Sequence, residues 1–352
     1  MSNIMRCPEC NANHRRRAGM TCSCGYRFVL TRQEFDITDF AFHKLIAQVS
    51  ANDQHHFTRR QLATAICHYW HKKATDFSIA PIIIISIIVI ILWSIFAWSY
   101  LAGGSVLALS LLTWFIYRRR KEPQLDFQKA RQVVQQYHKV HPLERMIEQR
   151  FFQGNDSEAG DEDIFYAPDQ MLIVERDELV DLLVLNGFHL TTRTAIVSAE
   201  GYPKHILAAC EKFLETSPKM PVYVAHGISK AKANWVDKLK KEPLWQKFQD
   251  RIIDLGPDLE QIKNSRSLLP WLQGKYLYFS RKSSKYLKNG GTMALDSLPT
   301  YRMLPMLAGA VTAGALMIGA AAAAGASSGV GGGAEDSDSD TLFSFDFGDD
   351  YG

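Results

Sequence analysis

Four cysteines near the amino terminus have the residue type and the spacing of metal ligands. Two residues separate Cys7 from Cys10, and after eleven more residues a single residue separates Cys22 from Cys24. Two cysteines on one tight turn can supply two of the four ligands of a tetrahedrally coordinated ion, and a second pair supplies the other two. Four thiolates leave no position for water, so such a site is structural rather than catalytic. A redox-active dithiol is the rival interpretation.

This pattern resembles the zinc-ribbon family over residues 5–30. The resemblance implies a small β-ribbon packed by Tyr26 and Phe28, with a structural Zn²⁺ as the cofactor. The implied ligands are Cys7, Cys10, Cys22 and Cys24. The second pair departs from the commoner C-x-x-C spacing of the family, and His14 is therefore an outside candidate for a ligand.

Three consecutive arginines lie between the two cysteine pairs, namely Arg15, Arg16 and Arg17. Ribbon loops of this kind can contact nucleic acid or phosphate. A solvated, charged loop explains the same residues, and both interpretations stay open.

A second group of candidate residues follows strands expected in the middle of the chain. The expected strands cover residues 171–174, 194–199, 221–227 and 251–256, and the expected helices cover 177–188, 202–215 and 229–241. This alternation is typical of βαβ crossovers and of a parallel sheet covered on both faces. Functional residues gather where such strands end. Glu175, Glu200 and His226 stand at three of these ends and are weak catalytic candidates.

Residues 172–227 resemble the Toprim module of type IIB topoisomerase A subunits. Val174-Glu175-Arg176 matches a first motif of that family, and Gly201-Tyr202-Pro203 matches a second. The third motif of the family, an Asp-x-Asp pair that completes a magnesium site, is replaced by Ala225-His226-Gly227. The resemblance therefore implies the fold rather than the activity, because Mg²⁺ prefers hard oxygen ligands. Asp254 or Asp258 could still complete a site that linear spacing hides.

Two long uncharged stretches, residues 81–100 and 101–117, predict a transmembrane helical hairpin. Basic residues flank both ends, which places both flanks on the cytoplasmic side. We therefore expect a lipid bilayer as a partner. The expected location is the bacterial inner (cytoplasmic) membrane, with the amino terminus and the α/β domain in the cytoplasm. A buried core hairpin is the alternative.

Charge is distributed unevenly along the chain. All 40 Lys and Arg precede residue 303, whereas the last fifty residues carry seven acids. Residues 303–326 are uncharged and rich in Ala and Gly, which predicts a third transmembrane or membrane-associated helix. A weakly hydrophobic hairpin or a flexible tail is the alternative. Residues 327–352 predict a disordered acidic tail.

Together these segments predict a multidomain membrane protein. An apolar content of 47% excludes a wholly disordered chain, and six cysteines are too few for a disulfide scaffold. The expected units are a zinc ribbon at 1–33, a helical unit at 34–73, a transmembrane hairpin at 79–117, a helical linker at 122–165, an α/β parallel-sheet (Rossmann/Toprim-like) domain at 166–300, the helix at 303–326 and the tail at 327–352.

None of these units carries a complete set of catalytic residues. The expected function is therefore a membrane-anchored, non-catalytic adaptor or sensor. It would use the zinc ribbon and the degenerate Toprim-like α/β domain to bind partners at the cytoplasmic face of the membrane, and protein partners could bind the cytoplasmic domain or the acidic tail. The alternatives are a membrane-tethered, metal-dependent phosphodiester enzyme of the nuclease kind and a protein that tethers nucleic acid. A second copy of the chain, in a homo-oligomer, is a further candidate partner.

Overall fold

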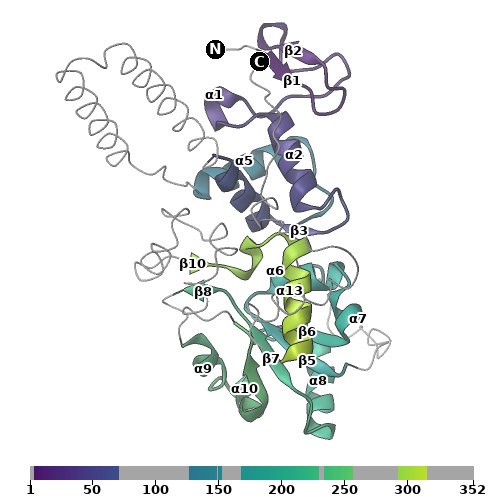
Figure 1. Ribbon diagram of the computed structural model, residues 1–352, viewed down its shortest axis with the longest axis vertical. Coiled ribbons are helices and arrows are strands. Elements are labelled where there is room, and N and C mark those ends of the chain that lie inside the picture. Colours follow the sequence, from purple (N-terminus) through teal and green to yellow (C-terminus); the bar gives the residue numbers. More distant parts are fainter. Residues whose placement is uncertain are drawn as a thin grey trace, which may run out of the picture.

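The computed structural model describes residues 4–70, 127–148, 150–152, 168–229, 234–256 and 292–314. Three parts follow one another along the long axis of the molecule (Figure 1): a small ribbon at one end, a helical unit in the middle and an α/β domain at the other end.

The ribbon is built from two short antiparallel strands, β1 (Ile4–Arg6) and β2 (Asn13–Arg15). The 3₁₀ turn η1 (Arg16–Ala18) follows β2. Its small core consists of Met5, Cys7, Cys22, Tyr26 and Phe28. A core of five side chains is too small to stabilise a fold without a further crosslink.

The helical unit packs four helices around one core. These are α1 (Arg32–Phe35), α2 (Asp39–Val49), a helix at residues 59–70 and α5 (Phe127–Val140). The apolar stripe of α5 at Ala130, Val133, Val134 and Tyr137 is buried in this core. The sequence suggested a helical linker over 122–165, whereas the structure places α5 inside the helical unit.

A reciprocal pair of hydrogen bonds starts the helix at residues 59–70. The Gln61 amide nitrogen donates to the Thr58 hydroxyl at 3.2 Å, and the Thr58 amide nitrogen donates to the Gln61 side-chain oxygen at 2.8 Å. This capping box satisfies backbone donors that the first helical turn leaves without intrahelical partners. It fixes Thr58 in the two-residue strand β3 (Phe57–Thr58), which pairs in parallel with β4 (Met146–Ile147).

The α/β domain contains a four-stranded parallel sheet in the order β6-β5-β7-β9. The strands are β5 (Gln170–Val174), β6 (Thr194–Ser198), β7 (Val222–Ala225) and β9 (Ile252–Asp254). They coincide closely with the expected strands, because buried parallel strands appear in sequence as short apolar runs between turns.

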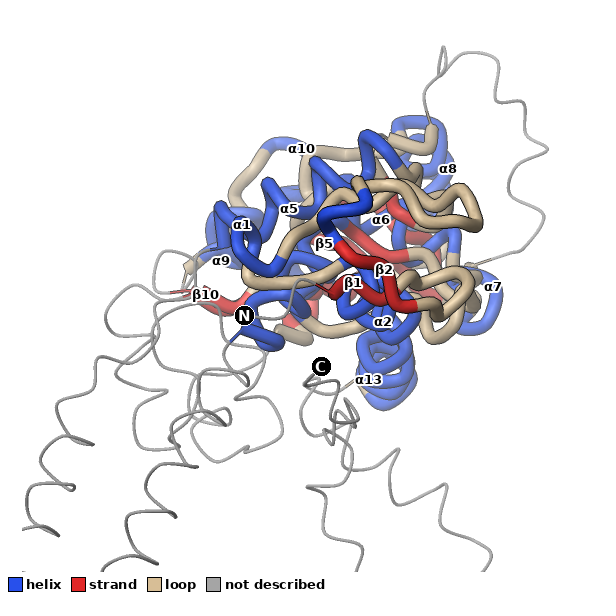
Figure 2. The backbone as a smooth tube through the Cα atoms, turned by 90° about the horizontal axis from the view of Figure 1, so that it is seen from above, coloured by secondary structure: helices blue, strands red, loops and turns tan. Residues whose placement is uncertain are grey.

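Helices cover both faces of this sheet. One face packs against α6 (Asp177–Leu185), α7 (Phe188–Thr192) and α13 (Thr300–Ala313). The other packs against α8 (Lys204–Thr216), α9 (Trp235–Leu239) and α10 (Pro243–Gln246). Figure 2 shows α8 and α10 on the side opposite α7 and α13. The 3₁₀ turns η4 (Gln249–Arg251) and η6 (Leu295–Ser297) precede β9 and α13, and the short strands β8 (Ile228–Ser229) and β10 (Thr292–Met293) pair antiparallel.

Hydrogen bonds join the helical unit to the α/β domain. Asn186, at the end of α6, accepts from the backbone amide of His56 at 2.9 Å and donates to the His56 carbonyl at 3.2 Å. The side-chain amide of the buried Gln61 donates to the Leu298 carbonyl at 2.7 Å. The helical unit therefore rests on the segment between β10 and α13.

Helix α13 corrects the expectation of a third membrane helix over residues 303–326. Met303, Leu307, Ala310 and Val311 recur at helical spacing and are buried against the sheet. The helix ends at Gly314, whose φ of 59° is left-handed, and residues 315–326 lie outside the described residues. At about 1.5 Å per residue, fourteen residues span roughly 21 Å, which is shorter than a bilayer core.

The membrane component of the expected fold class is contradicted. Across the part of the chain that the structure describes, no helix combines the length and the hydrophobicity needed to cross a bilayer. What the structure contains instead is an α/β domain with a parallel sheet, a helical unit and a cysteine cluster. The hairpin expected at 79–117 lies outside the described residues, as does the tail at 327–352.

Candidate metal centre and sheet-edge site

Two tight turns present the four cysteines of the ribbon. In the first, the Asn11 amide nitrogen donates to the Cys7 carbonyl at 3.1 Å, and Asn11 adopts a left-handed φ of 57°. In the second, the Gly25 amide nitrogen donates to the Cys22 carbonyl at 2.9 Å, and Gly25 has a φ of 95°. Glycine tolerates this conformation without the steric cost that a Cβ would add.

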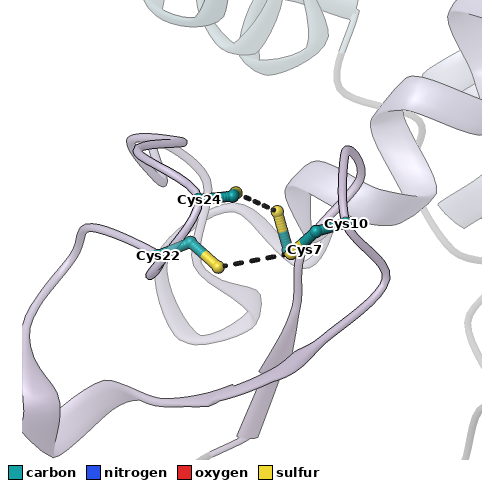
Figure 3. Close-up of side chains that lie close together, drawn as sticks. All are labelled: Cys7, Cys10, Cys22 and Cys24. Atoms are coloured by element: carbon teal, nitrogen blue, oxygen red, sulfur yellow. Dashed lines mark hydrogen bonds between the residues drawn. The ribbon is translucent and has the colours of Figure 1, made fainter.

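The four thiols converge on one point (Figure 3). Sγ of Cys7 lies 3.6 Å from Sγ of Cys24, and Sγ of Cys10 lies 3.6 Å from Sγ of Cys22. All four sulfur atoms lie within 4.8 Å of one another. Zn–S bonds of about 2.3 Å in a tetrahedron place sulfur atoms roughly 3.8 Å apart, so the spacing fits a tetrahedral metal ion. The expected cysteine cluster is therefore confirmed as a candidate metal centre.

The thiols also influence one another electrostatically. A hydrogen bond from the backbone amide of Cys24 lowers the pKa of Cys22, and hydrogen bonds with the neighbouring thiols lower it further, to about 6. A backbone hydrogen bond from Tyr26 acts to lower the pKa of Cys24, but burial and the other three thiols raise it to about 12. Four thiolates cannot coexist so closely without a cation, and a bound metal would supply that positive charge.

A buried carboxylate fastens the ribbon to the helical unit. Asp39, which is 1% exposed, accepts hydrogen bonds from the Tyr26 hydroxyl at 3.1 Å and from the Leu30 amide at 3.0 Å. The Tyr26 hydroxyl lies 3.2 Å from that of Tyr137, and the Tyr26 ring stacks on His141 with centroids 4.5 Å apart. Burial raises the pKa of Asp39, although these hydrogen bonds act against the rise.

His14 is not part of the cysteine cluster. Its Nε2 lies 2.9 Å from the carbonyl oxygen of Gly19, and its ring stacks on Phe28 with centroids 5.4 Å apart. His14 thus supports the loop between the two turns. Among the described residues, only the four cysteines form a group of three or more side chains that could hold a metal ion.

The second candidate site lies where β5 and β7 end. The chain runs from β5 to β6 on one side of the sheet and from β7 to β9 on the other, so the crossovers diverge between β5 and β7. In doubly wound sheets, ligands bind at this topological switch point. Glu175 follows β5 there, and its Oε2 accepts from the Gly227 amide at 3.4 Å. Arg176 also pairs with Glu175, with Nε 3.9 Å from Oε1.

His226 follows β7 at the same edge, and Asp254 forms the end of β9. Nδ1 of His226 lies 2.7 Å from the Gly227 carbonyl oxygen, and Nε2 lies 3.1 Å from Oδ1 of Asp254. A general base needs a free nitrogen that faces the substrate. Both ring nitrogens of His226 are occupied, which argues against its candidacy as a base.

The third weak catalytic candidate, Glu200, is exposed beyond the end of β6. The structure thus brings Glu175 and His226 to one place, where the backbone of Gly227 lies between them. Asp254, which could have completed a metal site, lies with its Oδ1 3.1 Å from Nε2 of His226. Asp258 lies outside the described residues.

The second matched motif has a structural role. The Tyr202 hydroxyl donates to Oδ1 of the buried Asp181 at 2.8 Å and accepts from the Phe152 amide at 2.9 Å. Gly201 has a φ of 82°, and a Cβ there would lie 2.9 Å from a methyl carbon of Leu207. This motif therefore anchors the segment at 150–152 to the domain.

One buried acid escaped the sequence analysis. Asp296 in η6 has no exposed surface, and its Oδ1 lies 2.5 Å from the Arg176 guanidinium and 3.6 Å from Nε of Arg60. The Thr58 hydroxyl donates to its Oδ2 at 3.1 Å. These partners come from both the helical unit and the α/β domain, and no local sequence signal links residues so far apart.

Comparison with known proteins gives no match for this chain among family models, curated sequences or solved structures. The resemblance to zinc ribbons therefore depends on the cysteine cluster itself. No family match supports the resemblance to Toprim modules.

Proposed function

We propose that this protein is a non-catalytic adaptor whose ribbon, held by a structural zinc ion, binds an acidic segment of a protein partner. The observation that supports this proposal most directly is the closed set of four thiols, with sulfur pairs 3.6 Å apart. Four protein ligands complete the coordination of zinc and leave no site for a substrate. Cys7, Cys10, Cys22 and Cys24 would hold the ion, and its charge would lock the two turns together.

Metal analysis of the purified full-length protein tests the zinc assignment. One zinc per chain is expected, since tetrahedral sites with four sulfur ligands select zinc or iron. Cys10→Ser combined with Cys24→Ser should abolish binding, whereas Cys210→Ala, at a buried cysteine of the α/β domain, should retain it. Protein with all cysteines reduced and no stoichiometric metal would contradict the assignment and favour the redox dithiol.

The arginines of the ribbon supply the proposed contact surface. Arg15, Arg16 and Arg17 are exposed at the end of β2 and in η1. Exposed guanidinium groups can pair with carboxylates through two parallel hydrogen bonds, which suits an acidic peptide segment.

Affinity capture with the full-length protein as bait tests this surface. A variant with all three arginines changed to serine should lose a partner that the wild-type protein recovers. The matched control changes the exposed Lys204, Lys212 and Lys219 of α8 and its following turn to serine, which removes the same charge elsewhere. Equal recovery of every protein by both variants would contradict the proposal.

Tethering of nucleic acid is a second candidate function, because the same exposed arginines could contact phosphates. Binding to a labelled DNA duplex should then weaken steeply with salt, and the arginine variant should lower the slope of log K against log salt by up to about three. A flat salt response would exclude this candidate.

A phosphodiester enzyme is less well supported than either binding function. At the end of β7, both ring nitrogens of His226 have hydrogen-bond partners. The side chain of Glu175 is 3% exposed and accepts from a backbone amide. The predicted location at a membrane depends on residues 79–117, which lie outside the described residues.

A further inference from the structure

The imidazole of His226 faces a hydrogen-bond acceptor at each of its two nitrogens. The Gly227 carbonyl oxygen lies 2.7 Å from Nδ1, and Oδ1 of Asp254 lies 3.1 Å from Nε2. A carbonyl oxygen accepts hydrogen bonds and cannot donate them. A neutral imidazole carries a single N–H and satisfies one of these partners, whereas the imidazolium donates to both.

The carboxylate of Asp254 is itself an acceptor. Burial acts to raise the pKa of Asp254, but the hydrogen bond and charge of His226, the Gly256 amide and the charge of Lys240 hold it below its ordinary value. The Gly256 amide donates to the same Oδ1 at 2.7 Å. Asp254 is therefore ionised near neutral pH and offers His226 a negative charge.

We propose that His226 is an imidazolium at neutral pH that acts as a pH-dependent clamp, holding the end of strand β9 against β7 beside the switch point of the sheet. This role is separate from the metal centre and from the proposed binding surface of the ribbon.

Charged groups from three elements surround the clamp. Glu175 at the end of β5 and Asp254 in β9 are the negative charges that act on His226. Lys240, which follows α9, is the positive charge near Asp254. The Trp235 ring of α9 covers the imidazole, with centroids 5.5 Å apart. The positive charge of the imidazolium is thus balanced by two negative charges.

The backbone beside the clamp is shaped to admit the imidazole ring. A Cβ on Gly256 would lie only 2.1 Å from Nε2 of His226. Any larger residue would displace the imidazole from Asp254. Glycine at this position therefore lets the chain leave β9 directly over the ring.

Strand β9 depends on this contact because its own pairing is short. It contains three residues and, within the part of the chain that the structure describes, pairs only with β7, which leaves Ile253 40% exposed. The Leu255 amide, just beyond the strand, donates to the Val224 carbonyl at 2.8 Å. Exchange of this amide with solvent reports whether the end of β9 is closed.

The direction of the pH dependence follows from the surroundings of His226. Burial acts to lower the pKa of His226, but its hydrogen bonds to Asp254 and Gly227 and the two negative charges raise it above the ordinary value of 6.5. The folded-state pKa then exceeds that of the unfolded chain. The clamp is fully formed below pH 6.5 and is lost as the pH rises through the raised value.

Two measurements on the full-length protein test the clamp. NMR of histidine-labelled protein should show the ring of His226 titrating above pH 6.5. Hydrogen exchange of the Leu255 amide, corrected for its intrinsic pH dependence, should accelerate above that pKa by about tenfold for each unit of pKa elevation. The His226→Gln variant identifies the NMR signal and should remove the step in exchange, whereas His43→Gln on α2 should keep it.

The proposal fails if His226 titrates at or below pH 6.5, or if the exchange step is identical in His226→Gln and His43→Gln. The ring titration needs no variant, so it remains decisive even if His226→Gln does not fold. Asp254→Asn adds an independent check, because loss of the negative charge should lower the pKa of His226. An unchanged titration in Asp254→Asn would overturn the proposed pairing.

Discussion

Arg60 and Asp296 form an ion pair between the helical unit and the α/β domain, with Nε of Arg60 3.6 Å from Oδ1 of Asp296. The same carboxylate accepts from Arg176 and from the Thr58 hydroxyl, and it has no exposed surface. Two guanidinium groups thus share one buried negative charge. The helical unit and the α/β domain are therefore joined through this carboxylate, which the short 3₁₀ turn η6 supplies.

Replacing Asp296 by Asn should destabilise the protein by about 3–5 kcal/mol. The change removes the buried negative charge that Arg60 and Arg176 share, although Arg176 keeps its ion pairs with Glu175 and Glu178. Breaking a buried pair in this way costs about that much. Denaturant unfolding of the full-length protein measures the loss. Asp250→Asn, at an exposed position, should change stability by less than about 0.5 kcal/mol. Similar values for both variants would refute this account of the joint.

Removing the metal should unfold the ribbon and leave the parallel sheet intact. The five-residue core of the ribbon cannot hold the two cysteine turns together alone, since small metal domains draw their folding energy from the ion. Hydrogen exchange in the presence of a strong zinc chelator should accelerate at Cys22 and remain slow at Leu172 in β5. Unchanged protection of Cys22 after verified metal loss would count against the prediction.

Truncation of Leu307 in α13 should cost about 2–5 kcal/mol. Its side chain is fully buried against the sheet, and a Leu→Ala change there loses transfer free energy and opens a cavity. Thermal unfolding compares this variant with Thr312→Ala, at an exposed position near the end of the same helix. A negligible effect of Leu307→Ala would place α13 outside the core of the α/β domain.

Removal of the Tyr26 hydroxyl should loosen the ribbon from the helical unit. Tyr26→Phe leaves the buried Asp39 with one donor fewer and also ends the contact with Tyr137, at a net cost of about 1–2 kcal/mol. Amides of the ribbon should then exchange roughly tenfold faster, because 1.4 kcal/mol corresponds to that factor. Tyr301→Phe in α13 is the matched change outside the ribbon and should leave those amides unaffected.

The strands and the metal centre were predictable because their signals are local. Buried parallel strands are short apolar runs, and the expected strand at 171–174 corresponds to β5 (Gln170–Val174). The spacing of the two cysteine pairs can be read directly from the sequence, and the structure brings all four cysteines together. In both cases a few neighbouring residues determine the geometry.

The roles of α13 and α5 were harder to predict because apolar helices have the same composition in different surroundings. Residues 303–313 are uncharged, and only the left-handed Gly314 limits the helix to a length that suits a core. The apolar stripe of α5 is buried, but nothing in the linear pattern identifies the residues that it packs against. The ion pairs of Asp296 and His226 join residues from distant elements, so nothing in the linear pattern reveals them.

The helix at residues 59–70 and helix α5 share one core, although residues 71–126 separate them in the sequence. Nζ of Lys129 lies 5.3 Å from the centre of the Trp70 ring, so the chain departs from this core and rejoins it at a single spot. The end of the helix at residues 59–70 and the start of α5 are thus held next to each other on the helical unit. Replacing those 56 residues by a short glycine-serine bridge should therefore leave the packing of these two helices intact.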